Sequence, residues 1–274
     1  MKNSKHSCHG SHDIQLPSVA PKGREKELIQ DLISSIKSPE TPVDKIVPGP
    51  KFMAVIAGGR MGIAATLGAE PDENDLAMFE SAPGKPLKTV AEYAYMASPG
   101  AAVLGIAAIN AGCSPDPAGV EPCDFPADDL IAELGKNRNV GLVGDFPFVQ
   151  SLGLRVGTLH LFELMDIKGA VPKDQWEKTL AQLDVLALTA TTLLTRQAAW
   201  YLDKANQADI VILGPTTPAS PVLFQYGADY LCGSVVTDAD RVAQGIKAGL
   251  PFSRVKKNGG IIFTRWQKKD IAGA

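Results

Sequence analysis

The chain has 274 residues, 45% of them hydrophobic and 21% charged, and this composition is typical of a packed globular protein. Its 27 basic and 30 acidic residues are scattered and give a net charge of −3, so we expect no nucleic-acid partner. Four cysteines in a chain of this length exclude a disulfide framework, and the polar N-terminus excludes a secretory signal. We therefore expect a cytoplasmic protein.

Residues 1–23 are predicted to form a mobile tail, because they are polar and lack hydrophobic periodicity. The tail holds His6, Cys8, His9 and His12 in close succession. Imidazole and thiolate groups at such spacing bind Zn, Ni or Cu. A divalent metal ion is therefore a candidate ligand of this segment, and a tail without a function is the open alternative.

Residues 24–112 are predicted to form a small α+β domain. Its expected elements are a helix over residues 24–37, strands over 52–57 and 60–67, and helices over 89–97 and 100–112. Gly58 and Gly59 between the strands favour a type I′ hairpin turn, in which both central residues take a positive φ. The apolar run over residues 100–113 is shorter than the roughly 20 residues that cross a bilayer, so we expect a buried helix and no membrane span.

Residues 113–129 are predicted to be a linker, since they hold four prolines and five acidic residues without periodicity. Residues 130–274 then alternate short apolar strands with helices. The expected strands cover residues 140–143, 156–162, 185–188, 210–213, 230–231 and 261–264, and the expected helices cover 173–183, 192–206, 220–226 and 238–247. Thr191 or Thr192 is expected to cap the second of these helices and Thr237 the last. The alternation favours a Rossmann-like domain with a parallel sheet covered by helices on both faces.

Ligands of such a sheet bind beyond the carboxyl ends of its strands. The segments GLVGDFP, TATTLLT and GPTTP and an acidic residue lie at predicted strand ends, and we expect them to converge on one polar interdomain cleft with an amide from the first domain. The candidate cleft residues are Asn110, Gly141, Gly144, Asp145, Glu163, Thr189, Thr192, Gly214, Thr216 and Thr217. No nucleophile–base pair is identifiable among them. No catalytic residue is therefore assigned, and whether the protein is an enzyme stays open.

A resemblance to a known family is carried by an ordered series of segments: NVGLVGDFPFV, the strand ending in Glu163, DVLALTATTLLT and ADIVILGPTTPASPVLFQYGADYLCGSVVTD. With FMAVIAGGRMGIAATL and GAAVLGIAAINA before them, these segments resemble proteins of a heavy-metal chelation family. The resemblance implies an enolase-N-terminal-like domain, a Rossmann-like domain after it, and a site where the two meet. The family tends to carry Gly and Asn in the TATTLLT loop, where this chain has Ala190 and Thr195.

Three functions agree with these observations. The first is binding or handling of a metal or a metal chelate, although the cleft offers oxygen and amide groups whereas soft metals prefer thiolate and imidazole. The second is an enzyme that uses S-adenosylmethionine or a nicotinamide, with Glu163 on the ribose; the G-x-G-x-x-G motif is missing, and Asp145 would repel phosphate. The third is a non-catalytic subunit or scaffold whose helix over residues 100–112 packs on a partner. A small molecule or a metal is the expected ligand, and a homo-oligomer is compatible with each function.

Overall fold

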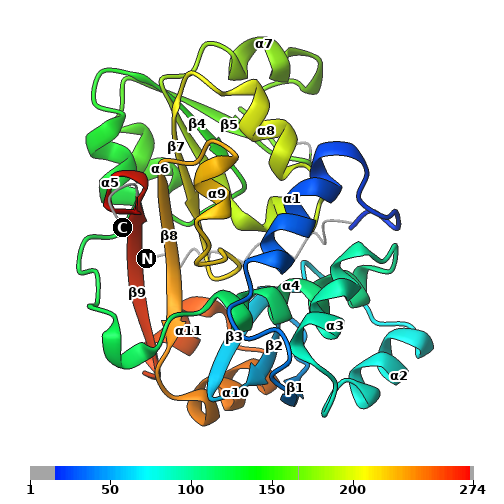
Figure 1. Ribbon diagram of the computed structural model, residues 1–274. Coiled ribbons are helices and arrows are strands. Elements are labelled where there is room, and N and C mark those ends of the chain that lie inside the picture. Colours follow the sequence, from blue (N-terminus) through cyan, green and yellow to red (C-terminus); the bar gives the residue numbers. More distant parts are fainter. Residues whose placement is uncertain (1–15, 166, 272–274) are drawn as a thin grey trace, which may run out of the picture.

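The computed structural model describes residues 16–165 and 167–271, which form two β-sheets with helices around them (Figure 1). The four tail residues His6, Cys8, His9 and His12 lie outside the described residues. The fold is a mixed α/β fold with a small antiparallel sheet and a larger, mostly parallel sheet, and the predicted fold class is confirmed.

The small sheet is antiparallel with the strand order β1-β2-β3. Its strands are β1 (Val43–Val47), β2 (Phe52–Ala57) and β3 (Arg60–Ala65). Gly58 and Gly59 join β2 to β3 with φ of 55° and 75°, so the predicted hairpin is confirmed. β1 was not predicted from the sequence, because two of its three inner residues, Asp44 and Lys45, are charged and exposed.

The helices of the first half are α1 (Gly23–Ser34), α2 (Glu73–Ser81), α3 (Leu87–Ala91), η1 (Glu92–Tyr95) and α4 (Pro99–Cys113). All residues of α4 after Pro99 are buried, and the helix packs against β2, β3 and α3. A side-chain carbon added at Gly62 of β3 would lie 2.0 Å from the backbone nitrogen of Ala111, so the two elements touch along their backbones. The interpretation of α4 as a partner-binding surface is therefore wrong, because the chain itself covers it.

The large sheet has the strand order β5-β4-β6-β7-β8-β9. Its strands are β4 (Asn139–Val143), β5 (Thr158–Phe162), β6 (Val185–Thr189), β7 (Asp209–Leu213), β8 (Tyr230–Val236) and β9 (Ile261–Gln267). The first five strands are parallel, whereas β9 runs antiparallel to β8 and begins where β8 ends, with Ile261 paired to Val236. The chain reverses here because the intervening helices stay at that edge and pack on the small sheet.

The helices of the second half are η2 (Pro117–Gly119), α5 (Ala127–Leu134), α6 (Val149–Gly153), η3 (Lys173–Gln175), α7 (Trp176–Leu180), η4 (Ala190–Leu193), α8 (Ala198–Lys204), α9 (Val222–Gln225), α10 (Ala239–Lys247), α11 (Phe252–Lys257) and α12 (Lys268–Ile271). The helix predicted over residues 192–206 is divided in two at Arg196, whose φ is 61°. Two predicted caps are also wrong. Thr189 caps η4 and Asp238 caps α10, because each lies in extended backbone directly before its helix.

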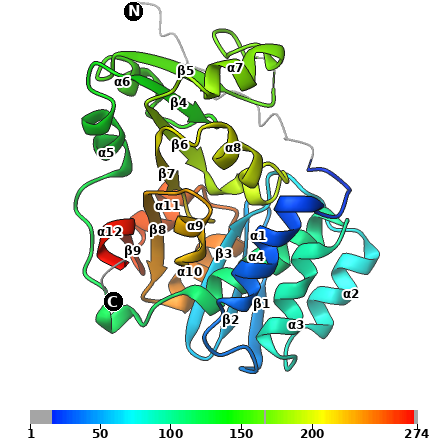
Figure 2. The same ribbon diagram turned by 45° about the horizontal axis from the view of Figure 1, so that its top comes forward.

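The two halves share a hydrophobic core. One face of the large sheet is covered by α5 and α6, and the other by α7, α8 and α9 (Figure 2). From the first half, α1 packs against α8 and α9, while from the second half α10 packs on β1 and β2. Elements of each half therefore pack against the other half. The predicted domain boundary at residues 113–129 stays a prediction. No helix within the described ranges is both long and apolar enough to cross a bilayer.

Candidate ligand-binding site

The order of the strands locates the candidate site. From β4 the chain passes to β5 on one side of that strand, and then to β6 on the other side. Such a change of direction leaves a crevice at the carboxyl ends of the strands, where open α/β sheets bind their ligands. A pocket of about 510 Å³ lies there. This volume is within the range of small-molecule sites.

The pocket is lined by both polar and apolar residues. The polar residues are two acids, four threonines, an amide and a phenol: Asp145, Glu163, Thr189, Thr191, Thr192, Thr195, Gln197 and Tyr201. The apolar residues are Leu67, Val143, Phe146, Phe162, Leu164, Met165 and Ile167. Among these, Leu67 lies two residues after the end of β3, so the pocket receives a lining residue from the first half of the chain.

Gly144 brings the three strand ends together. Its φ is 102°, and a side-chain carbon at this position would lie 3.2 Å from Cγ2 of Thr189. Its N–H donates a hydrogen bond to the carbonyl oxygen of Phe162, at a distance of 3.0 Å. Because glycine tolerates a positive φ and has no side chain, the chain can turn directly after β4, in the narrow space between the ends of the neighbouring strands β5 and β6.

The charge of the pocket is negative. Glu163 is only 8% exposed, and its Oε1 accepts a hydrogen bond of 2.7 Å from the N–H of Leu164. Asp145 is exposed at the rim. Burial, and then the charge of Glu163, raise the pKa of Tyr201 above its ordinary value, so this phenol stays protonated and can donate a hydrogen bond. No Lys, Arg or His is among the described lining residues, and a neutral or cationic ligand therefore suits the pocket better than a phosphate.

The threonine loop is held by its own hydrogen bonds. Thr189 Oγ1 lies 3.0 Å from Thr191 Oγ1 and also accepts a longer bond from the N–H of Thr191. The hydroxyl of Thr192 donates to the carbonyl oxygen of Thr189 at 2.7 Å. These bonds fix the loop, so the hydroxyl groups that line the pocket are held in defined positions.

Five of the predicted cleft residues line this pocket: Gly144, Asp145, Glu163, Thr189 and Thr192. The other five lie elsewhere. Gly141 is inside β4, where a side-chain carbon would lie 2.3 Å from Leu183 of the core. Gly214 follows β7 and is not among the lining residues of this pocket. The structure therefore brings together the predicted residues of the loops after β4, β5 and β6, and their role in binding a ligand stays a prediction.

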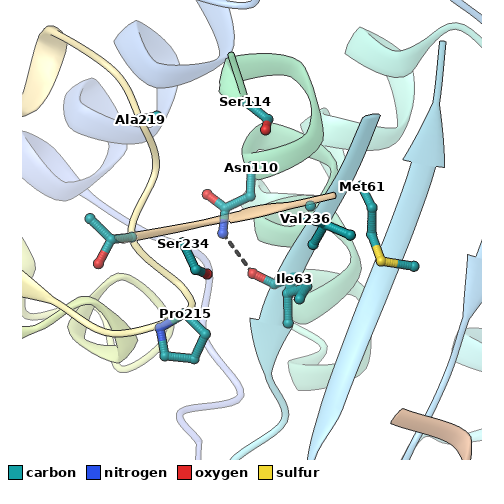
Figure 3. Close-up of a pocket in the computed structure, with 10 residues that line it drawn as sticks. Met61, Ile63, Asn110, Ser114, Pro215, Ala219, Ser234 and Val236 are labelled. Carbon is teal, nitrogen blue, oxygen red and sulfur yellow. Dashed lines mark hydrogen bonds between the residues drawn. The ribbon is translucent and has the colours of Figure 1, made fainter. Parts of the chain in front are cut away.

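The GPTTP loop after β7 forms a joint between the two halves. Oγ1 of Thr216 accepts a hydrogen bond of 3.0 Å from the N–H of Ala65 at the end of β3. The side-chain amide of Asn110 donates to the carbonyl oxygen of Ile63 at 2.7 Å (Figure 3). It also donates to the carbonyl oxygen of Thr216 at 3.0 Å. Asn110 and Thr217 line a separate small cavity beside these bonds. Asn110, Thr216 and Thr217 thus lie at this joint and not among the lining residues of the pocket after β4, β5 and β6, because β3 and α4 cover the end of β7.

Sequence reasoning missed the apolar residues that line the pocket. Phe146 and Phe162 are direct neighbours of the predicted Asp145 and Glu163, so the segments that carry them were available as a signal. Leu67 and Tyr201 gave no such signal, because only the packing of β3 and α8 brings them to the strand ends.

Residues 127–265 match the model of the DUF364 family, and residues 29–113 match that of DUF4213. The chain belongs to the DUF364 family. Both models carry the description "Putative heavy-metal chelation". An uncharacterized protein of Methanocaldococcus jannaschii is 30% identical to the chain over 154 residues, which are 53% of this chain and 58% of that relative. The chain thus spans less than two thirds of the length of this relative.

Two crystal structures of DUF364 proteins with unknown function have the same fold. The protein from Desulfitobacterium hafniense superimposes with a TM-score of 0.76 and is 24% identical, over 89% of this chain and 98% of its own. The protein from Pyrococcus horikoshii has a TM-score of 0.72 and is 20% identical, over 89% of this chain and 99% of its own. The family resemblance seen in the sequence is confirmed.

Proposed function

We propose that this DUF364 protein binds a metal as a chelate, already held by a small organic ligand, in the pocket at the ends of β4, β5 and β6. The observation that carries the proposal is the composition of the pocket. Two carboxylates and four threonines line the pocket together with aromatic and aliphatic side chains, and the described lining residues include neither Cys nor His. The description of the family supports a metal as part of the ligand.

A bare heavy-metal ion suits this pocket poorly. Soft and borderline metals prefer thiolate and imidazole ligands. Within residues 16–165 and 167–271, no group of three or more His, Cys, Asp or Glu side chains could hold a metal ion. The donor atoms of a bound heavy metal would therefore have to come from a chelator. The protein would recognise the complex from outside, by its charge and its organic surface.

The charged, apolar and hydroxyl-bearing lining residues each have a part in this recognition. Glu163 attracts a complex with a positive charge, and its burial strengthens the attraction, because water screens it less. Phe146 and Phe162 offer contact area for the carbon atoms of a chelator. The threonine loop supplies fixed hydrogen-bonding groups that orient polar atoms of the ligand. A volume of about 510 Å³ accommodates a small chelate rather than an ion alone.

The test uses the full chain with His6, Cys8, His9 and His12 replaced by alanine, so that the tail contributes no imidazole or thiolate donors. Isothermal titration calorimetry compares Ni²⁺ alone with the equimolar, dicationic complex of Ni²⁺ and phenanthroline. We expect the complex to bind and Ni²⁺ alone not to bind. Glu163→Gln should weaken binding of the complex by roughly tenfold or more, as expected for the loss of a charged partner.

Asp240→Asn is the matched control, because this exposed acid of α10 is not among the lining residues. It should leave the affinity for the complex unchanged. The proposal is wrong if Ni²⁺ alone binds as tightly as the complex, or if Glu163→Gln and Asp240→Asn have equal effects.

A second candidate is a cofactor that contains adenosine but no phosphate, such as S-adenosylmethionine. Glu163 follows β5, the strand beside β4, and this is the position from which an acid binds the ribose in dinucleotide folds. The negative charge of the pocket disfavours a pyrophosphate and tolerates a sulfonium. A thermal-shift comparison at millimolar concentration should raise the melting temperature with S-adenosylmethionine but not with NAD⁺. An unchanged melting temperature with both would exclude this candidate.

A further inference from the structure

The small cavity at the joint lies between the two halves, with walls from β3, α4, β8 and the loop after β7 (Figure 3). Its volume is about 10 Å³, which is close to the space that one water molecule occupies. None of the residues that line it is charged.

The first atom that points to a ligand is Oδ1 of Asn110. This side chain is 7% exposed, and both hydrogens of its amide nitrogen are donated, one to Ile63 and one to Thr216. Because both acceptors are carbonyl oxygens, they fix which end of the amide is nitrogen. Oδ1 therefore points away from Ile63, and it is buried without a hydrogen-bond partner among the described residues (Figure 3).

The second atom is Oγ1 of Thr217, and this residue lines the same cavity. Thr217 is 5% exposed, and its hydroxyl likewise has no partner within the described chain. Buried polar atoms almost always have a partner, either in the protein or in ordered water. Both residues line the same cavity, and one small ligand that donates hydrogen bonds to both oxygens would satisfy them.

We propose that one water molecule is bound in this cavity, where it donates hydrogen bonds to Asn110 Oδ1 and to Thr217 Oγ1. A metal cation fits less well, because the walls offer no negative charge to offset its loss of hydration. The water would complete the joint, since it links the GPTTP loop to α4 beside the direct bonds of Thr216.

The test is Thr217→Val, which replaces the hydroxyl by a methyl group of similar size. If the water is present, the variant loses the hydrogen bond between the water and residue 217. The equilibrium constant of unfolding, measured in urea, should then rise about two- to tenfold. If the cavity is dry, the substitution removes an unpaired hydroxyl, and the stability should stay the same or increase. A constant that does not rise overturns the proposal.

Thr264→Val is the matched control. Its hydroxyl is also buried without a partner in the described chain, but Thr264 does not line the cavity. This variant should be as stable as the unmodified protein or more stable.

A second measurement identifies the ligand itself. Oxygen-17 relaxation dispersion should detect one fewer long-lived water in Thr217→Val than in the unmodified protein, and an equal number contradicts the proposal. Exchange of Na⁺ and K⁺ for choline should leave the melting temperature unchanged. A fall on exchange would indicate a monovalent cation in place of water.

Discussion

Two regions of the molecule join the same two halves but do so with different chemistry. At the joint after β7, the neutral hydroxyl of Thr216 accepts the N–H of Ala65 from the first half. At α8, the helix that carries the pocket residue Tyr201, the carboxyl group of Glu25 on α1 accepts the N–H of Ala199 at 2.7 Å. Both are single side chains that bond to the backbone of the other half. Only the second of them can change its charge.

This difference affects the pocket, because α8 carries Tyr201 in its wall. Burial raises the pKa of Glu25 to about 7, although the N–H groups of Ala199 and Trp200 and the charge of Arg196 act in the opposite direction. Oε2 of Glu25 is buried without a hydrogen-bond partner in the described chain, so the ionised form is poorly compensated. The pocket wall therefore rests on a contact that depends on pH, whereas the joint does not.

The largest expected effect is the dependence of the protein's stability on pH through Glu25. The pKa of Glu25 is raised from 4.5 to about 7 in the folded protein, so its contribution to stability is fully present below about pH 4.5 and is lost as the pH rises through about 7. A shift of this size corresponds to about 3 kcal/mol in the free energy of unfolding. Urea unfolding across this pH range should show that the free energy of unfolding of the unmodified protein falls as the pH rises. Glu25→Gln should abolish this fall, although its side chain keeps a carbonyl acceptor for the N–H of Ala199.

Glu27→Gln is the control for that experiment, because Glu27 is exposed on the same helix. It should keep the dependence of the unmodified protein on pH. A pH profile in Glu25→Gln that matches the unmodified protein would show that another group carries the titration.

The comparison also shows what can be predicted from the sequence. TATTLLT and GPTTP have the same appearance, a hydroxyl-rich loop after an apolar strand, and local pattern alone assigns both to one cleft. The strand order separates them, since β6 borders the switch point at β4 whereas β7 lies one place further along. The hairpin at Gly58 and Gly59 and the acid at the end of β5 depend on neighbouring residues and were predicted correctly.

Features that arise from packing between distant segments were not predictable in this way. Leu67 reaches the pocket, and Asn110 reaches the joint, only because β3 and α4 lie against the large sheet. The direction of β9 likewise depends on the packing of α10 and α11 against the small sheet. Hydrophobic periodicity reports that a segment is buried, but it does not report which surface buries it.

The smaller expected effect concerns the neutral contact at the joint. Thr216→Val removes the acceptor of the Ala65 N–H in a position where Thr216 is fully buried, so the stability should fall by about 1–3 kcal/mol. Thr195→Val in the pocket is the comparison, because the hydroxyl of Thr195 makes only long hydrogen bonds of 3.4 and 3.3 Å. That variant should lose less than about 0.5 kcal/mol.

Unlike the effect at Glu25, the loss of stability in Thr216→Val should be the same at every pH in urea unfolding, since no charge is involved. Equal losses in the two threonine variants would mean that the joint is no more rigidly held than the pocket loop, and the contrast between the two regions would then be confined to the charge of Glu25.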